Sequence, residues 1–385
     1  MTRRRICVVG GGLAGMAAAL ACADAGAEVT LVERRRRLGG ATWSFRHNGL
    51  WFDNGQHVFL RCCTAYRAFL DRLGVADRVR LQPRLDVPVI APGGRTSRLR
   101  RSRWLPAPAH LGGSLLAYRH LGVRDRLRLG PAALALRRVD LGAAETDRLT
   151  FGEWLGRHGQ SPAAQDALWD LICRPTVNLP AAEASLALAA MVFRTGLLTA
   201  ADVAPDLDGL RGVGDRLGVS PIVNVHVVYD RPVTDLEFAA GVGTDVQFVF
   251  DRSAGAGLER GQYLAVSLSA ADPYMDRSSD EVKAAVVAGL AELFPRARAA
   301  RVVDALVSRE PAATFRGAPG SAAARPGATT AIPGLVLAGA WTATGWPATM
   351  EGAVRSGNTA AHHALLAAGH MRRLPARPAD EEVVV

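Results

Sequence analysis

The sequence contains little of what a membrane-spanning, disulfide-stabilised or nucleic-acid-binding protein requires. No uninterrupted apolar run reaches the ~20 residues of a transmembrane helix. The five cysteines form no CxxC pair and no even framework, which argues against a disulfide scaffold and against a metal site, and favours a reducing cytoplasm. Aromatic residues make up 6% of the chain and no nucleic-acid-binding module is recognisable, so we expect no nucleic-acid partner.

Lysine is almost absent, since Lys283 is the only lysine among 46 basic residues. Residues 1–150 contain 26 arginines and 11 acidic residues, whereas the remainder of the chain contains 20 basic and 25 acidic residues. The N-terminal part is therefore strongly basic within a chain of net charge +10. Such a surface suits an anionic lipid or a phosphate-bearing cofactor.

The bulk composition is that of a globular protein, with 49% hydrophobic and 21% charged residues in a chain of 385. Its length suits one large domain or two ordinary ones. Apolar periodicity and capping signals predict strands at 6–9, 29–32, 50–52, 221–230, 245–250, 263–268, 301–308 and 335–337. They predict helices at 16–25, 66–80, 280–294 and 352–368, and helical pieces within 92–150 and 151–200.

The first strand leads into a glycine turn that fits the pattern G-x-G-x-x-G at Gly10, Gly12 and Gly15. These glycines allow a tight turn, close approach of the backbone to a diphosphate, and close packing of helix and strand. Leu13 and Ala14 lie at the helix N-terminus, whose free N–H groups attract an anion. Glu33, at the end of the second strand, is placed to bond ribose hydroxyls. The alternative is a glycine-rich connection without a ligand.

A run of four arginines beginning with Arg34 follows Glu33, and then the double glycine Gly39-Gly40. This order resembles that of FAD enzymes related to amine oxidases and carotenoid desaturases. The resemblance implies that Arg34, Gly39 and Gly40 contact FAD. Each arginine could equally belong to a solvated charge run.

A second glycine-rich block near the C-terminus resembles the flavin end of the same superfamily. A predicted strand ends at Gly339, and a predicted helix begins near Met350 and Glu351. The resemblance implies that this helix N-terminus points at the flavin pyrimidine, where its dipole stabilises negative charge. Ala340 stands where the family often has an aspartate that bonds the ribityl chain. A strand and helix without a ligand is the alternative.

Asp53 and His57 are the first and last residues of the sequence Asp-Asn-Gly-Gln-His, which follows a short predicted strand. One interpretation places them beside flavin and substrate, where one of them acts as a general acid. The other is an ordinary turn, since Asn-Gly is a turn signal by itself. His226 lies in an alternating strand and is interpreted as a structural histidine.

Together with residues 62–73, 220–226 and 346–352, the motif at 53–57 resembles the hydroxysqualene dehydroxylases, the squalene-associated FAD-dependent enzymes of bacterial hopanoid pathways. The resemblance covers most of residues 5–75, 150–200 and 220–368. It implies an α/β fold with an FAD-binding, glutathione-reductase-type Rossmann-like domain and a mixed α+β substrate domain. It also implies that reduced FAD gives a hydride to hydroxysqualene, a long-chain isoprenoid, yielding squalene and water. A long apolar tunnel would be lined from 104–120, 150–200 and 221–268.

The resemblance also divides the chain. It implies FAD-binding parts at 1–75 and 311–370, a mainly helical substrate-facing or membrane-facing region at 76–200, and substrate-domain strands and a helix at 221–310. Family members carry a further flavin-domain strand between the equivalents of residues 198 and 220. Only a shortened linker, 201–220, joins these regions here, so we infer an internal deletion near 198–205. The tail, 371–385, is expected to be disordered.

Residues 95–118 join an arginine cluster to an apolar stretch that contains Trp104. This pattern suits peripheral contact with the inner face of an anionic cell membrane, and a solvated surface beside a tunnel helix is the alternative. Two other functions stay open. One is a carotenoid desaturase of opposite redox direction, and the other is an inactive prenyl-lipid-binding remnant. The sequence does not indicate an oligomeric state.

Overall fold

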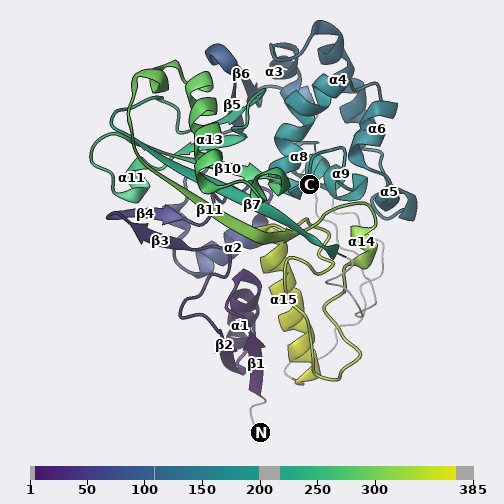
Figure 1. The fold of residues 1–385 in the computed structure, drawn as a ribbon. Helices are drawn as coiled ribbons and strands as arrows, with labels where there is room; N and C mark the ends of the chain where they lie inside the picture. Colours follow the sequence, from purple (N-terminus) through teal and green to yellow (C-terminus); the bar gives the residue numbers. More distant parts are fainter. Residues whose placement is uncertain (1–4, 108, 199–216, 370–385) are drawn as a thin grey trace.

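The computed structural model describes residues 5–107, 109–198 and 217–369. The predictions of a disordered tail at 371–385 and of the shortened linker up to residue 216 lie outside the described residues. Within them, the chain forms three packed parts: a small dinucleotide-type unit, a large sheet and a helical region (Figure 1).

The first described strands and the last described helix pack together in the dinucleotide-type unit, at the lower end of Figure 1. It contains β1 (Arg5–Val9), α1 (Leu13–Asp24) and β2 (Glu28–Val32) from the N-terminal part, and α15 (Met350–Ala367) from the C-terminal part. Strands β1 and β2 are parallel, in a register from Arg5 opposite Glu28 to Val9 opposite Val32. Helices α1 and α15 cross closely, because a Cβ on Gly357 would lie 2.2 Å from the carbonyl oxygen of Ala14.

A seven-stranded sheet forms the middle of the molecule in the order β11-β7-β10-β9-β8-β5-β6. Its strands are β5 (Asp86–Ala91), β6 (Arg95–Arg100), β7 (Val219–Tyr229), β8 (Phe238–Gly241), β9 (Phe248–Asp251), β10 (Gln262–Ser269) and β11 (Val302–Phe315). Neighbours are antiparallel except β5 and β8. Helix α13 (Ser279–Leu293) packs on the sheet through Val282, Val286 and Leu290, and its predicted capping box is confirmed.

A β-hairpin of β3 (Ser44–His47) and β4 (Leu50–Asp53) packs on the sheet as well. Phe52 is its anchor, because it is buried among Val228, Tyr263 and Ala265. Short elements lie near these strands: α11 (Ser253–Ala256), α12 (Asp272–Met275), η6 (Pro295–Ala299) and α14 (Ser321–Ala324). The hairpin lies between the sheet and the dinucleotide-type unit (Figure 1), and Asp53 is the last residue of β4.

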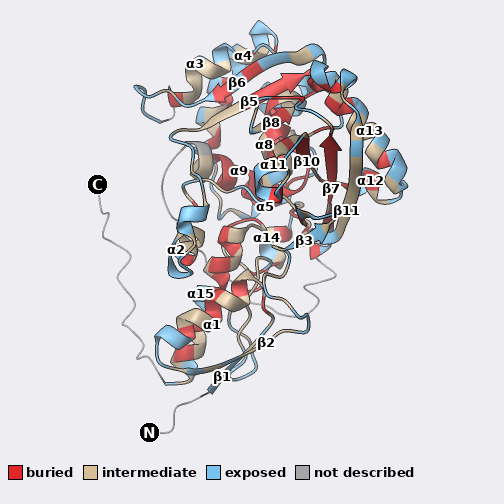
Figure 2. Cartoon of the chain, turned by 90° about the vertical axis from the view of Figure 1, so that its left-hand side faces the viewer, coloured by how far each residue is buried: buried red, intermediate tan, exposed pale blue. Residues whose placement is uncertain are grey.

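The helical region covers the far end of the molecule and has its own core, which includes Phe151, Trp169 and Phe193. Its elements are α3 (Gly112–Leu116), α4 (Val123–Leu136), α5 (Ala144–Arg148), α6 (Phe151–Arg157), α7 (Pro162–Ala164), η4 (Gln165–Trp169), α8 (Asp170–Val177), α9 (Leu186–Phe193) and η5 (Arg194–Leu198). Single turns η1 (Ala76–Arg78), η2 (Pro92–Gly94) and η3 (Ala109–Leu111) connect other elements. Figure 2 shows α9 as almost wholly buried, as its continuous apolar sequence requires.

Several predicted elements differ from the structure. The helix predicted for 66–80 is α2 (Thr64–Arg72) followed by a bend and η1, and the strand predicted to begin at 245 begins at Phe248. The region expected to be helical from residue 92 starts with strand β6, whose alternating arginines lie on one edge of the large sheet. The strand predicted at 335–337 does not form. In that segment Val336 makes one isolated bridge, to Thr329.

Among the described residues, no helix combines the length and the apolarity needed to cross a bilayer. The same residues contain no group of three or more His, Cys, Asp or Glu side chains arranged to hold a metal ion.

Candidate cofactor site

The glycine turn after β1 is built by contacts that exclude larger residues at two positions. Gly10 has a φ of +106° and donates its N–H to the carbonyl of Val32 at 2.8 Å. A Cβ on Gly15 would lie 1.8 Å from the carbonyl oxygen of Gly10, which is a backbone atom and cannot swing aside. The first and third glycines are therefore required by the turn itself and by the close packing of α1 on it.

Gly12 is different, because nothing in the protein fills the space beside it. It is the N-cap of α1 and has an ordinary φ of −75°, and the nearest atom to an added Cβ would be the Cα of Gly40, 4.0 Å away. No side chain caps this helix, and no acidic residue lies in its first turn. The N–H groups of Leu13, Ala14 and Gly15 are thus not used by a cap, and this helix end suits a diphosphate.

Glu33 ties the end of β2 to the glycine turn. Its carboxylate accepts hydrogen bonds from the N–H of Gly11 at 2.6 Å and from the N–H of Arg35 at 2.8 Å. These bonds, that of Arg35 first, lower the pKa of Glu33, so it is ionised at neutral pH. A carboxylate has about four acceptor positions, so this arrangement leaves capacity for the ribose hydroxyls.

The double glycine packs directly against the first turn. Gly39 donates its N–H to the carbonyl of Gly11 at 2.8 Å, and Gly12 and Gly39 form a parallel bridge. A Cβ on Gly40 would lie 3.0 Å from the Cα of Gly12. This close approach explains the two glycines without a ligand, and it also keeps the space beside Gly12 free of side chains.

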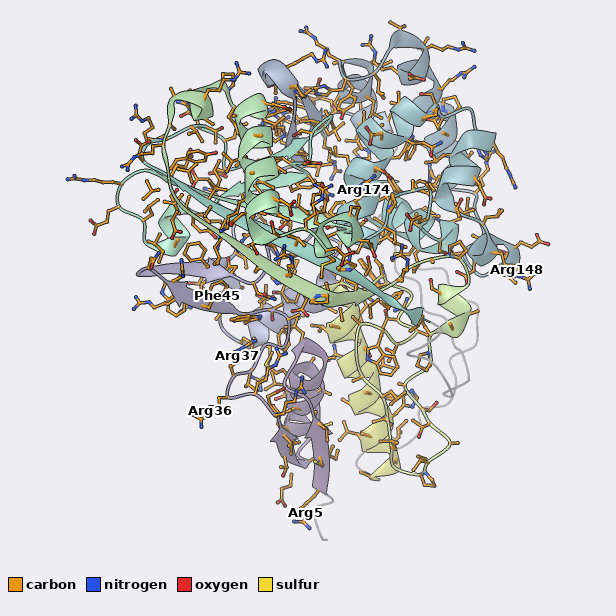
Figure 3. The ribbon with its side chains drawn as sticks, in the orientation of Figure 1. Arg5, Arg36, Arg37, Phe45, Arg148 and Arg174 are labelled. Atoms are coloured by element: carbon orange, nitrogen blue, oxygen red, sulfur yellow. The ribbon has the colours of Figure 1, made fainter. Side chains whose placement is uncertain are left out.

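The arginines after Glu33 do not converge on the turn. Arg34 is exposed, and Figure 3 shows Arg36 pointing away from the molecule. Arg37 instead lies with its guanidinium carbon 4.0 Å from the centre of the Trp43 ring and donates to the carbonyl of Gly40 at 3.2 Å. Arg37, which the motif did not single out, is the arginine that braces the double glycine, and an FAD contact from Arg34 stays a prediction.

A cavity of about 520 Å³ is lined by residues of both glycine-rich blocks. The predicted cofactor residues that line it are Gly10, Gly12, Leu13, Ala14, Gly15, Gly339 and Ala340. The cavity continues past them along β1 from Ile6 to Val9, and between the small side chains of α1 and α15. The end of the cavity at the glycines fits a dinucleotide. The rest of the cavity, along β1, is lined by apolar side chains and does not suit a charged diphosphate.

The segment that carries Gly339 and Ala340 is held by a side chain that the sequence patterns did not indicate. Arg325 is buried and donates to the carbonyl of Ala340 at 3.1 Å, to the carbonyl of Thr342, and to the hydroxyl of Thr344 at 3.1 Å. Burial lowers its pKa to about 10, so the guanidinium still carries its charge at neutral pH. Arg325 therefore fixes the loop between residues 339 and 344 through hydrogen bonds to backbone carbonyls and one hydroxyl of that loop.

Helix α15 begins at Met350, with the Thr349 hydroxyl accepting the N–H of Gly352 at 3.1 Å. The carboxylate of Glu351 is buried and points to another element. It accepts the N–H groups of Ala65 at 3.1 Å and Tyr66 at 2.7 Å, at the N-terminus of α2, and it pairs with Arg355 at 2.6 Å. Glu351 thus positions α15 against α2, and contacts of Met350 and Glu351 with FAD stay predictions.

Asp53 is engaged by the protein. Its carboxylate accepts the Ser44 hydroxyl at 2.6 Å and pairs with Arg252 at 2.8 Å. His57 is exposed as a residue, but enough protein surrounds its imidazole that desolvation lowers its pKa. The ring is therefore neutral at neutral pH, which suits hydrogen bonding better than the role of a charged acid.

Asn54 links this loop to both neighbouring parts. Its N–H donates to the carbonyl of Trp43 at 2.8 Å, and its own carbonyl accepts the amide of Asn224 on β7 at 2.8 Å. Asn224, which the sequence patterns did not reveal, also accepts the Ser267 hydroxyl at 2.6 Å. The loop from Asp53 to His57 is consequently fixed between the double-glycine segment and the large sheet.

His226 lies under this loop, fully buried, with its Nδ1 2.6 Å from the Tyr263 hydroxyl. Phe45 and Phe52 pack edge-on against its ring. Burial lowers its pKa to about 4. These contacts fit the predicted structural histidine, although its Nε2 has no hydrogen-bond partner among the described residues.

Comparison with solved structures shows that this architecture is shared with two amine oxidases. A double mutant of putrescine oxidase has a TM-score of 0.64 at 18% identity, covering 94% of this chain and 99% of that chain. The cyclohexylamine oxidase of Brevibacterium oxydans has a TM-score of 0.62 at 18% identity, covering 94% and 98%. The fold is thus a Rossmann-like unit combined with a large mixed sheet, as in these oxidases.

The sequence model of the flavin containing amine oxidoreductases matches residues 13–214 and 198–365, and the chain belongs to this family. Hydroxysqualene dehydroxylase of Rhodopseudomonas palustris is 28% identical, over 94% of this chain and 98% of the relative. The 15-cis-phytoene desaturase of Synechococcus elongatus is 22% identical, over 93% and 95%. The protein is therefore a flavin-type oxidoreductase that resembles the hydroxysqualene dehydroxylases, as its motifs indicated.

The comparisons also bear on the inferred deletion. The alignment with the R. palustris enzyme spans 433 positions, more than the 385 residues of this chain, so that relative carries residues without a counterpart here. The family model matches in two segments that overlap at residues 198–214, beside the place where the sequence predicts the loss. The position of the deletion stays a prediction.

Proposed function

We propose that the protein is an FAD-dependent hydroxysqualene dehydroxylase, which converts hydroxysqualene to squalene and water. The observation that carries the proposal is the similarity to enzymes of that name along nearly the full length of both chains. The glycine turn, the open helix end at Gly12 and the acidic Glu33 fit FAD as the particular flavin, because FAD carries both a diphosphate and an adenosine ribose.

The residues of this chain bind and orient the cofactor. The N–H groups of α1 bind the diphosphate, and Glu33 bonds the ribose hydroxyls. Arg325 holds the loop at Ala340 in place. Bound in its reduced form, FAD supplies the hydride that replaces the substrate hydroxyl.

The hydroxyl must leave with a proton, so the site needs a group that orients or protonates it. Neutral His57 serves as the orienting hydrogen-bond partner in this proposal, while Asp53 holds Arg252 and Ser44 in place. The balance is one hydride and one proton consumed, one C–O bond broken, one C–H bond formed and one water released. Apolar walls exclude bulk water, because water would recapture an allylic cation.

A carotenoid desaturase is the second candidate, since desaturases align over most of this chain at 22–24% identity. It would remove hydrogen from its substrate and so run in the opposite redox direction. An inactive prenyl-lipid-binding remnant is the third candidate, supported by the apparent deletion and by Ala340.

The decisive experiment incubates the purified full-length chain, reconstituted with FAD and kept reduced without oxygen, with hydroxysqualene. We expect squalene to form, and we expect the Gly12→Ala variant, which binds FAD more weakly, to form less squalene when FAD is limiting. A parallel reaction supplies phytoene and an electron acceptor. Desaturation of phytoene without squalene formation would replace the proposal by the second candidate. Full FAD binding with no product in either reaction would favour the third.

A further inference from the structure

Helix α4 has two apolar stripes on opposite sides. Leu129, Ala132 and Leu136 are buried against the helical region, as expected for a surface helix. Val123, Leu127 and Leu134 are between 51% and 64% exposed, although all three are large and apolar. At about 100° per residue these three lie within about 40° of arc, so they form one outward stripe. Each of these side chains keeps more than half of its surface exposed among the described residues, so the stripe adds little to the buried core.

Arginines border the outward stripe on both sides. Arg124 and Arg128 are exposed on one side of α4, where Arg128 also donates to the carbonyl of Gly159 at 3.3 Å. Arg126, which donates to the carbonyl of Leu116 at 2.6 Å, lies on the other side. Arg137 and Arg138 follow directly after the last turn and are also exposed. None of these arginines forms an ion pair with a carboxylate of the described residues, and their charge stays uncompensated.

The surface around α4 has the same character. Trp104 is 90% exposed, and Leu105 and Leu116 are about half exposed. Figures 1 and 2 place β6, α3 and α4 together at the end of the molecule opposite β1. Of the arginines on β6, Arg98 and Arg100 are paired with Asp86. Arg95, Arg101 and Arg103 form no ion pair with a described carboxylate, so unpaired arginines lie on both α4 and the neighbouring segment that the sequence had singled out.

We propose that the arginine-flanked face of α4, formed by Val123, Leu127 and Leu134 with Arg124, Arg128, Arg137 and Arg138, docks on an anionic lipid bilayer. An apolar stripe with cations on both borders is the pattern of a helix that lies in the membrane interface. The apolar side chains enter the acyl boundary, and the arginines extend to the headgroup phosphates. Charge complementarity selects an anionic bilayer over a protein groove, which would need no cations on both borders.

The proposal goes beyond the catalysed reaction and does not depend on it. Flotation with phosphatidylglycerol-containing vesicles and with pure phosphatidylcholine vesicles tests it on the full chain. We expect binding to the anionic vesicles that weakens at high salt. The triple variant Arg124→Ser, Arg128→Ser, Arg138→Ser should bind about fivefold more weakly for each arginine removed. The triple variant Val123→Ser, Leu127→Ser, Leu134→Ser should lose binding while keeping the wild-type melting temperature, since these side chains contact solvent.

Matched controls remove the same numbers of exposed residues elsewhere. They are Leu73→Ser, Val303→Ser, Ile332→Ser for the apolar set and Arg260→Ser, Arg298→Ser, Arg301→Ser for the basic set. We expect both controls to bind as the wild type does. Equal losses in control and test variants, equal binding to neutral vesicles, or no vesicle binding by the wild type would each overturn the proposal. Binding of a soluble protein or nucleic acid through this face, without vesicle binding, would overturn it as well.

Discussion

Gly12 and Gly15 lie in one turn, yet the structure predicts opposite consequences for replacing them by alanine. An alanine at 12 meets no protein atom closer than 4.0 Å, and the backbone there has a φ that any residue adopts. We therefore expect Gly12→Ala to change the free energy of unfolding by no more than about 0.5 kcal/mol. Its methyl group instead enters the space in which the α1 N-terminus would meet the diphosphate.

The expected loss for Gly12→Ala is one hydrogen bond to a charged group, about 1.5–3 kcal/mol, or roughly a 10- to 150-fold weaker FAD dissociation constant. For Gly15→Ala the new methyl carbon would lie 1.8 Å from the Gly10 carbonyl oxygen, so α1 must move. Overpacking of this kind costs about 1–3 kcal/mol of stability before any ligand is added.

Two measurements separate the variants. Urea unfolding of the FAD-free proteins gives stability, and titration calorimetry gives the FAD dissociation constant. The reasoning requires a stable Gly12→Ala that binds FAD poorly and a Gly15→Ala that is itself destabilised. Unchanged FAD affinity in Gly12→Ala would refute the assignment of the open helix end to the diphosphate. Equal destabilisation of both variants would refute the described geometry of the turn.

Three further outcomes are expected. Burial lowers the pKa of His226 from 6.5 to about 4, so the contribution of its neutral form to the free energy of unfolding is complete above pH 6.5 and is lost as the pH falls to 4, by about 3 kcal/mol. The free energies of unfolding of wild type and His226→Gln, measured with urea, should therefore depend differently on pH over that range. An equal pH dependence would exclude this contribution. Glu351→Gln should lower the free energy of unfolding by about 1.5–3 kcal/mol, because the N-terminus of α2 and Arg355 lose a buried charged partner. An unchanged melting temperature would contradict the role of Glu351 in positioning α15 against α2. Inserting a relative's missing segment between Thr199 and Val203 should raise the flavin-to-protein absorbance ratio, and full occupancy of the unmodified chain would disprove this.

The parts of the fold that the sequence predicted are those encoded locally. The turn at Gly10–Gly15, the parallel pair β1 and β2, and the capping box of α13 each depend on residues close together in the chain. The parts it missed depend on distant partners. Strand β5 pairs in parallel with β8, about 150 residues further along, and no local pattern announces such a neighbour.

The same distinction holds for the candidate site. Glycine spacing predicted the turn, because Gly10 and Gly15 are required by its local backbone geometry. Arg325 and Asn224 escaped notice, because one buried arginine or one asparagine in a strand carries no pattern until the fold brings Ala340 or Asn54 beside it. Glu351 was assigned to the flavin end from its neighbours in the sequence, whereas its observed partners lie on α2.

The strand predicted at 335–337 does not form, and the reason involves the neighbouring edge of β1. In a parallel ladder alternate residues bond to one side, and since the Gly10 N–H donates to Val32, the backbone groups of Cys7 and Val9 point to the other edge of β1. No described strand pairs with that edge, and Val9 is 83% exposed. The cavity of about 520 Å³ lies between this edge and residues 335–340.

The cavity therefore has the position and lining of a vacant strand site. Its walls are apolar or small along β1, α1 and α15, as the two helix-covered faces of a parallel sheet require. Residues 335–337 have strand-like sequence but no strand to pair with, so they form one bridge instead of a ladder. The two segments of the family match overlap at 198–214, just before β7, which is where the sequence predicts an internal deletion. An edge left open in this way favours association with other chains. The glycine cradle, in contrast, is complete at the mouth of the same cavity, because every contact that forms it comes from residues 10–40. The described structure thus combines a locally formed glycine turn with an edge of β1 that no described strand pairs with.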